Sequence, residues 1–321
     1  MAPLPAAPRA AARLQSAVRR GWLWAWLAAA GVAAAVVRAH GAAGELRALP
    51  AHLGGLRLAW LSVAVAAQIV SLAGGTASQR LLLAAGGTRV RWRSVAGPVL
   101  ASTGLARVVP AGPVTGAAWQ VREYRRLGAG AGAGTWAVLA GGFTTVVVTL
   151  ALLLAGAAIA GTGTLLMLAC GGAVLAAIAA GLAAAPRRIV AVSRLSRHPR
   201  RAAGLLVYTA VGVAADAGVL AACFGLAGLA VPWRGLLFAY AAGQLGGRIV
   251  PLPGGLGGVE GGVIGALAVT GTAPAAAAAA VIIYRVGAFW ALGAAGLTVA
   301  AALTRRRRSS PELDPDAGRS R

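Results

Sequence analysis

A glycine- and proline-rich segment, residues 248–262 with the sequence RIVPLPGGLGGVEGG, lies inside an otherwise apolar region of the chain. Proline lacks the N–H that a helix needs and glycine loosens the backbone, so a helix entering this segment has to break. In hydrocarbon, a broken backbone persists only where protein or a water-filled cavity satisfies its polar groups. The segment also holds Arg248 and Glu260, and a charge at mid-membrane costs about 2.5–3.5 kcal/mol. We therefore predict a broken helix built around a polar site; a loop between two spans is the alternative.

The composition around this segment predicts a membrane protein. Of the 321 residues, 59% are hydrophobic, and the mean hydropathy of +0.76 far exceeds that of a soluble domain. All 30 basic residues are arginine, and they cluster in short loops between apolar runs, as cytoplasmic loops do. This distribution argues against nucleic acid as the partner, despite the net charge of +23.

The apolar runs predict an all-α polytopic membrane protein with six full spans and two re-entrant hairpins made of broken helices. We expect a single transmembrane domain over residues 21–303, between disordered cytoplasmic segments at 1–20 and 304–321. This topology places both termini in the cytoplasm and the protein in the cell inner (plasma) membrane. A cleavable signal peptide is the alternative for the first span. The predicted spans are 21–37, 58–78, 134–156, 163–185, 204–229 and 275–303, and the hairpins are 94–120 and 235–270.

The two broken segments match each other. RVVPAGP, which begins at Arg107, aligns with RIVPLPG, which begins at Arg248. Each half of the domain, about 21–157 and 163–303, would run span, span, hairpin, span, with the first hairpin entering from inside and the second from outside. Such an inverted-topology repeat with interrupted helices is typical of transporters.

The helices that follow the two breaks, expected near Val114 and Leu256, would point their N-termini at the membrane midplane. A helix N-terminus offers free N–H groups and about half a positive charge. Three arginines against two carboxylates would make the site net positive and suited to an anion such as a lipid phosphate. The alternative is that these charges pair with one another and only hold the fold together. The residues predicted to bind the substrate are Arg107, Pro110, Gly112, Asp216, Arg248, Pro251, Pro253, Gly254, Gly255, Gly257, Glu260, Tyr284 and Arg285.

The run PLPGGLGGVEG from Pro251, followed by Ile283, Tyr284 and Arg285 in the last span, resembles the signature of a known family. This is the lysylphosphatidylglycerol synthase transmembrane region family of flippase-like integral membrane proteins. The resemblance covers nearly the whole chain and implies movement of a polar lipid, or a lipid-linked sugar, between leaflets. Some relatives add a cytoplasmic aminoacyl transferase domain. The chain stops at residue 321, so we expect that synthase activity to be absent.

The first half departs from the family pattern, which has an asparagine before the proline and a Gly-Glu pair after it. Here Gly116 is followed by Ala117, and the next acidic residue is Glu123. The residues 143–145 stand where relatives have an arginine. We therefore expect the second half to carry recognition.

Taken together, these features predict a lipid flippase or transporter for an anionic or lipid-linked polar head group. The expected partners are membrane lipids, anionic or polyprenyl-linked, and proteins of envelope synthesis. The sequence shows no histidine–cysteine cluster, serine–histidine pair or closely spaced carboxylates, so we expect no enzymatic activity, catalytic residue, metal or cofactor. One alternative is a membrane subunit or enzyme of cell-envelope lipid or glycan assembly. Another is a structural partner in an envelope-synthesis complex.

Overall fold

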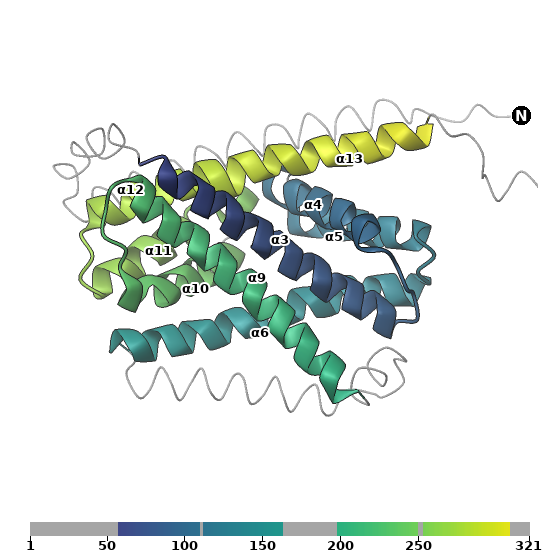
Figure 1. The fold of residues 1–321 in the computed structure, drawn as a ribbon, viewed down its shortest axis with the longest axis horizontal. Coiled ribbons are helices and arrows are strands. Elements are labelled where there is room, and N and C mark those ends of the chain that lie inside the picture. Colours follow the sequence, from purple (N-terminus) through teal and green to yellow (C-terminus); the bar gives the residue numbers. More distant parts are fainter. Residues whose placement is uncertain (1–56, 110–111, 163–197, 250–252, 309–321) are drawn as a thin grey trace, which may run out of the picture.

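The computed structural model describes residues 57–109, 112–162, 198–249 and 253–308, and every regular element in these ranges is a helix (Figure 1). A 3₁₀ turn at Pro253–Gly255 and a π-helical stretch at Arg285–Ala291 accompany the α-helices. The α-helices are α3 (Ala59–Ala85), α4 (Trp92–Val108), α5 (Gly112–Arg126), α6 (Ala131–Ala160), α9 (Pro199–Leu226), α10 (Trp233–Ile249), α11 (Gly258–Val269), α12 (Pro274–Tyr284) and α13 (Leu292–Arg308).

Within the described residues, four helices are long and apolar enough to cross a membrane. They overlap four of the predicted spans, and the helix that contains α12 and α13 continues to Arg308 rather than ending near residue 303. The predicted spans 21–37 and 163–185 lie outside the described residues. The four helices are Ala59–Ala85, Gly132–Ala160, Pro199–Leu226 and Pro274–Arg305.

The two glycine- and proline-rich segments break the helices, as predicted. In the first segment α4 ends at Val108 and α5 begins at Gly112; in the second, α10 ends at Ile249 and α11 begins at Gly258. The second break contains Gly254 with φ of 62°. A residue with a side chain pays about 1–2 kcal/mol to adopt such a left-handed conformation, whereas glycine adopts it freely.

Glycines bring the long helices into backbone contact. A Cβ added to Gly74 of α3 would lie 2.6 Å from the carbonyl oxygen of Tyr208 and 2.8 Å from the Cα of Gly212, both on α9. A Cβ on Gly104 of α4 would likewise lie 2.7 Å from the Cα of Gly296 on α13. Small residues of this kind let helices approach closely in a membrane, where burial of apolar side chains gives no driving force for association.

Apart from the pairs joined by the two breaks, α4–α5 and α10–α11, the most extensive packing is between α3 and α9, α6 and α10, and α4 and α13. In Figure 1, α3 and α9 run side by side, diagonally over the front of the molecule, with α4–α5 to the right of this pair and α10–α11 to the left. The larger apolar core consists mainly of residues from α9, α10, α11 and α12, and the smaller one mainly of residues from α3, α4, α5 and α6. Leu61, Val65 and Ile69 of α3 are exposed, as expected for side chains that face lipid.

Candidate functional site

A cavity of about 620 Å³ lies between the two halves of the chain, lined by α3, α4, α5 and α6 on one side and by α9 and α10 on the other. Its polar lining consists mostly of hydroxyl and amide side chains. These polar residues are Ser71, Ser78, Gln79, Ser102, Thr103, Gln120, Thr145, Thr149, Thr209, Asp216, Tyr240, Gln244 and Arg248.

Helix α10 contributes a polar stripe to this cavity. Tyr240, Gln244 and Arg248 follow one another at intervals of four residues, so they lie on one face of the helix. Arg248 ends the stripe with an exposed side chain. Among the described residues, Arg248 and Asp216 are the charged groups that line the cavity.

Asp216 is buried on α9 at 9% exposure, where it links three helices. Its Oδ2 accepts hydrogen bonds from the hydroxyls of Tyr240 on α10, at 2.8 Å, and Tyr284 on α12, at 3.0 Å. The Tyr284 hydroxyl in turn accepts a hydrogen bond from the Gln244 side-chain amide at 3.2 Å. Asp216 Oδ1 is buried and has no hydrogen-bond partner within the described ranges. An unmet acceptor at this position is costly, which points to a missing donor.

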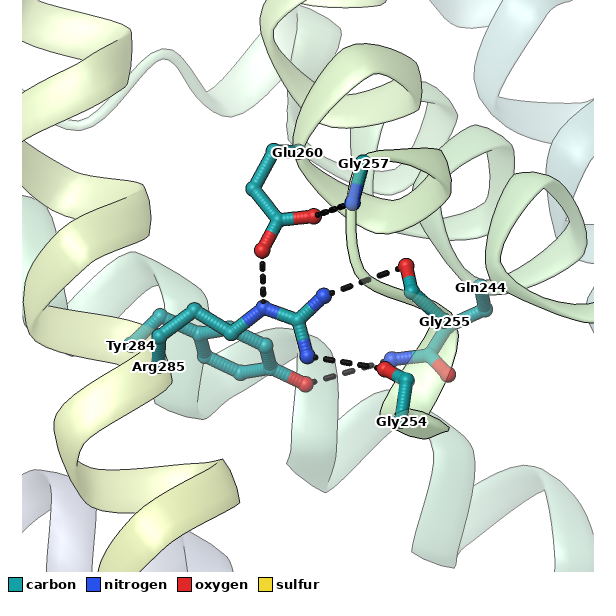
Figure 2. Close-up of polar contacts among 7 residues, drawn as sticks. All are labelled: Gln244, Gly254, Gly255, Gly257, Glu260, Tyr284 and Arg285. Atoms are coloured by element: carbon teal, nitrogen blue, oxygen red, sulfur yellow. Dashed lines mark hydrogen bonds and ion pairs between the residues drawn. The ribbon is translucent and has the colours of Figure 1, made fainter. Parts of the chain in front are cut away.

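The second break is held by an arginine–glutamate pair (Figure 2). Arg285 Nε lies 2.6 Å from Glu260 Oε1 as an ion pair, although the N–H is not aligned for a hydrogen bond. The Arg285 guanidinium donates to the carbonyl oxygens of Gly254 at 3.0 Å and Gly255 at 3.3 Å. Glu260 Oε2 accepts the N–H of Gly257 at 2.8 Å, which caps the start of α11. We call these five residues the hairpin brace.

The brace changes how the predicted charges are distributed. Glu260 and Arg285 pair with each other. For these two residues, the structure fits the alternative stated above, in which the charges pair and hold the fold together. The N–H of Gly257, one of the residues predicted to bind the substrate, is occupied by Glu260. Asp216 and Arg248, by contrast, face the cavity, and Tyr284 connects to it through Asp216.

The remaining predicted residues surround the breaks. Arg107 lies in the last turn of α4, and its Nη1 is buried without a hydrogen-bond partner among the described residues. Gly112 begins α5, where its missing side chain leaves room for the backbone of Ala106. Pro253 begins the 3₁₀ turn, which contacts α4. Pro110 and Pro251 lie outside the described residues.

None of the hydroxyl and amide residues that line the cavity was predicted, although the sequence carries a signal for them. Thr145 and Thr149 are spaced by four residues inside an apolar run, and Ser71 and Ser78 by seven residues inside another. Polar residues that recur at helical spacing in an apolar span indicate a face turned toward protein or water rather than lipid. These positions carry no charge and no helix-breaking residue, so neither of those two signals marks them.

No metal-binding cluster is present in the part of the chain that the structure describes, where no three His, Cys, Asp or Glu residues gather. Asp216 and Glu260, the two carboxylates of the predicted site, bind different partners. Asp216 contacts tyrosines, whereas Glu260 contacts Arg285 and the start of α11. The geometry therefore supports binding by the cavity and structural support by the brace.

A family model described as "Lysylphosphatidylglycerol synthase TM region" matches residues 10–296. The matched range includes the cavity, both breaks and the brace. A search of curated proteins finds no matching protein.

Proposed function

We propose that this chain, which belongs to the lysylphosphatidylglycerol synthase TM region family, is a flippase that moves an anionic or lipid-linked polar head group between leaflets. The family indicates a membrane protein of lipid and envelope metabolism, and the apolar helices make this chain a multi-pass membrane protein. We place it in the plasma membrane with both termini in the cytoplasm. We further propose that it acts without a catalytic residue or cofactor.

The observation that carries this proposal is the polar cavity between the two halves. Polar side chains in a membrane domain are costly next to lipid and therefore turn toward protein or a water-filled cavity. A volume of about 620 Å³ falls within the roughly 300–1,000 Å³ typical of ligand sites. Leu139 and Phe143 of α6 also line the cavity and are exposed, so an apolar tail could leave beside them and remain in the bilayer.

The helix packing supports an inverted repeat. Exchanging the halves pairs α3 with α9, α4 with α10, and α6 with the last long helix, α12–α13. Under this exchange the α3–α9 contact maps onto itself, and the α6–α10 contact maps onto α13–α4. A two-fold pseudo-symmetry of this kind underlies alternating access in transporters, where the substrate site lies at the interface between repeats.

The helix lengths favour re-entrant hairpins over full spans. The arms α4, α5, α10 and α11 have 17, 15, 17 and 12 residues. At about 1.5 Å per residue, the longest arm reaches only about 26 Å, short of a hydrocarbon core of about 30 Å. In the proposed mechanism the head group enters the cavity between the hairpins, and rocking of one half against the other along α3 and α9 exposes it to alternate leaflets.

A fluorescent-lipid assay in vesicles tests this function. The full chain is reconstituted with tail-labelled phosphatidylglycerol or phosphatidylinositol, and dithionite quenches the label that reaches the outer leaflet. We expect the protein to raise the quenched fraction of at least one lipid above that of empty vesicles. Quenching equal to empty vesicles for both lipids would refute transport of these phospholipids.

A matched pair of glycine variants connects that activity to the cavity. Gly142 on α6 lines the cavity and has open space around it, so Gly142→Trp should fill the cavity without disturbing the packing. Gly265 on α11 also has open space but does not line the cavity, which makes Gly265→Trp the control. We expect the first variant to block lipid movement and the second to retain it. Wild-type rates in Gly142→Trp would refute the cavity as the route.

A further inference from the structure

We infer that the cavity recognises a polyhydroxylated head group, a sugar or polyol ring joined to its lipid through one phosphate. The inference rests on the proposed lipid transport and names the substrate class of the same site. It comes from three features of the lining, as far as the described residues form it: hydroxyl groups that already donate their protons, a buried carboxylate oxygen without a hydrogen bond, and a single arginine without a counter-ion.

The cavity hydroxyls are available mainly as acceptors. Thr103 donates its proton to the carbonyl oxygen of Val99 at 2.8 Å, and Thr145 donates to that of Gly141 at 2.9 Å. Ser102 does the same with Val99 at 2.9 Å. A hydroxyl has one donor and two acceptor lone pairs, so each oxygen keeps acceptor capacity after its proton is used. The hydroxyl groups of the cavity therefore favour a ligand that offers hydrogen-bond donors.

Asp216 adds an unmet acceptor to this surface. It lines the cavity, is nine-tenths buried, and has Oδ2 occupied by the two tyrosine hydroxyls. Its Oδ1 has no partner in the part of the chain described. A buried, unpaired carboxylate oxygen is unfavourable, and an O–H group from a ligand would satisfy it.

Arg248 supplies the complementary donor. It is exposed at the cavity, and within the described residues no carboxylate pairs with it. A guanidinium forms a planar fork of N–H donors that matches the oxygens of a phosphate. The one arginine of the cavity matches one phosphate group. The hydroxyl and carboxylate acceptors of the lining match the rest of the head group.

The number and spread of the acceptors favour hydroxyls over an ammonium group. Seven serine and threonine residues line the cavity, carried by α3, α4, α6 and α9. A single ammonium has three donors at one point in space, so it reaches only a few of these oxygens. A ring with hydroxyls on its edge presents donors in several directions at once. The cavity lining does not distinguish between lipid tails, so the tail of the bound lipid is either a prenyl chain or diacylglycerol.

Competition binding in detergent tests the inference with two matched lipid pairs. The purified full chain is mixed with prenyl phosphate and prenyl-phosphoryl hexose, or with phosphatidic acid and phosphatidylinositol, and bound lipid is quantified by native mass spectrometry. We expect the ring-bearing lipid to bind roughly tenfold more tightly in at least one pair, the value of one or two hydrogen bonds. The pair that discriminates identifies the tail. Equal binding within both pairs, or tighter binding of phosphatidylethanolamine, would overturn the inference.

Threonine-to-valine variants locate the preference. Thr103→Val combined with Thr145→Val removes two cavity oxygens at nearly constant size and should reduce the preference for the ring roughly tenfold. Thr298 on α13 makes the same bond to its own helix, to Ala295 at 2.8 Å, but lies outside the cavity, so Thr298→Val should keep the preference. An unchanged preference in the double variant would overturn the inference.

The two proposals fail in different ways. Lipid movement in vesicles without any discrimination between the members of a pair would refute the head-group inference and leave transport standing. Discrimination in detergent without movement in vesicles would refute transport and leave the head-group inference standing.

Discussion

Removing the arginine of the hairpin brace should cost about 3 kcal/mol of stability. Arg285 and Glu260 are largely buried, with side-chain exposures of 11% and 27%, and they lie 2.6 Å apart. Breaking a buried pair from one side costs about 3–5 kcal/mol, and the partial exposure of Glu260 favours the lower end of that range. Arg285→Met keeps the side-chain length but leaves Glu260 without its cation and the Gly254 and Gly255 carbonyls without their donor.

Thermal unfolding in one detergent, followed by tryptophan fluorescence, measures this cost. At about 2 °C per kcal/mol for a large domain, Arg285→Met should lower Tm by about 6 °C. Arg234, exposed at the start of α10, provides the control, and Arg234→Met should stay within about 0.5 kcal/mol of wild type.

A double-mutant cycle separates the pair from other effects of the arginine. Glu260→Gln removes the charge but keeps an oxygen that can accept the Gly257 N–H, so it should cost less than Arg285→Met. Combining the two changes should cost at least about 1 kcal/mol less than the sum of the single costs, because residues in direct contact are coupled. Strict additivity, or a Tm for Arg285→Met within about 1 °C of wild type, would refute the brace as a structural element.

Two further predictions concern glycines. Gly74→Ala should destabilise the protein by about 1–3 kcal/mol in a Tm measurement, because the new methyl group meets the Tyr208 carbonyl of α9; Gly75→Ala, where space is open, should be neutral or stabilising by up to about 1 kcal/mol. Gly254→Ala should lower Tm by at least about 2 °C, because it combines a positive φ with a clash against the Phe289 ring. A Tm equal to wild type in either Gly74→Ala or Gly254→Ala would contradict the packing described for that site.

The breaks and the long apolar helices could be predicted because each depends on local chemistry. Proline and glycine disrupt helices wherever they occur, so the interruptions near residues 109–111 and 250–257 follow from the sequence alone. The ends were less accurate: α5 begins at Gly112 rather than near Val114, and α11 at Gly258 rather than near Leu256.

The partners of the charges could not be predicted, because they depend on how distant helices pack. Asp216 binds Tyr240 and Tyr284, which are 24 and 68 residues away in the sequence. Glu260 and Arg285 were predicted to bind substrate, with mutual pairing left open, and the structure has them paired. A serine or threonine that bonds to its own helix fits an apolar span on any face, so one such residue does not reveal a cavity.

The π-helical stretch at Arg285–Ala291 determines how α12 and α13, the two parts of one long helix, are rotated relative to each other. At its start, Arg285 contacts the second break and the preceding Tyr284 contacts α9; beyond its end, Gly296 of α13 meets Gly104 of α4. A π turn holds more residues than an α turn, so converting this stretch to regular α-helix would turn its two ends relative to each other by about 100° per residue of register. Both sets of contacts then could not form together, so the wider π turn is what lets this length of chain serve both.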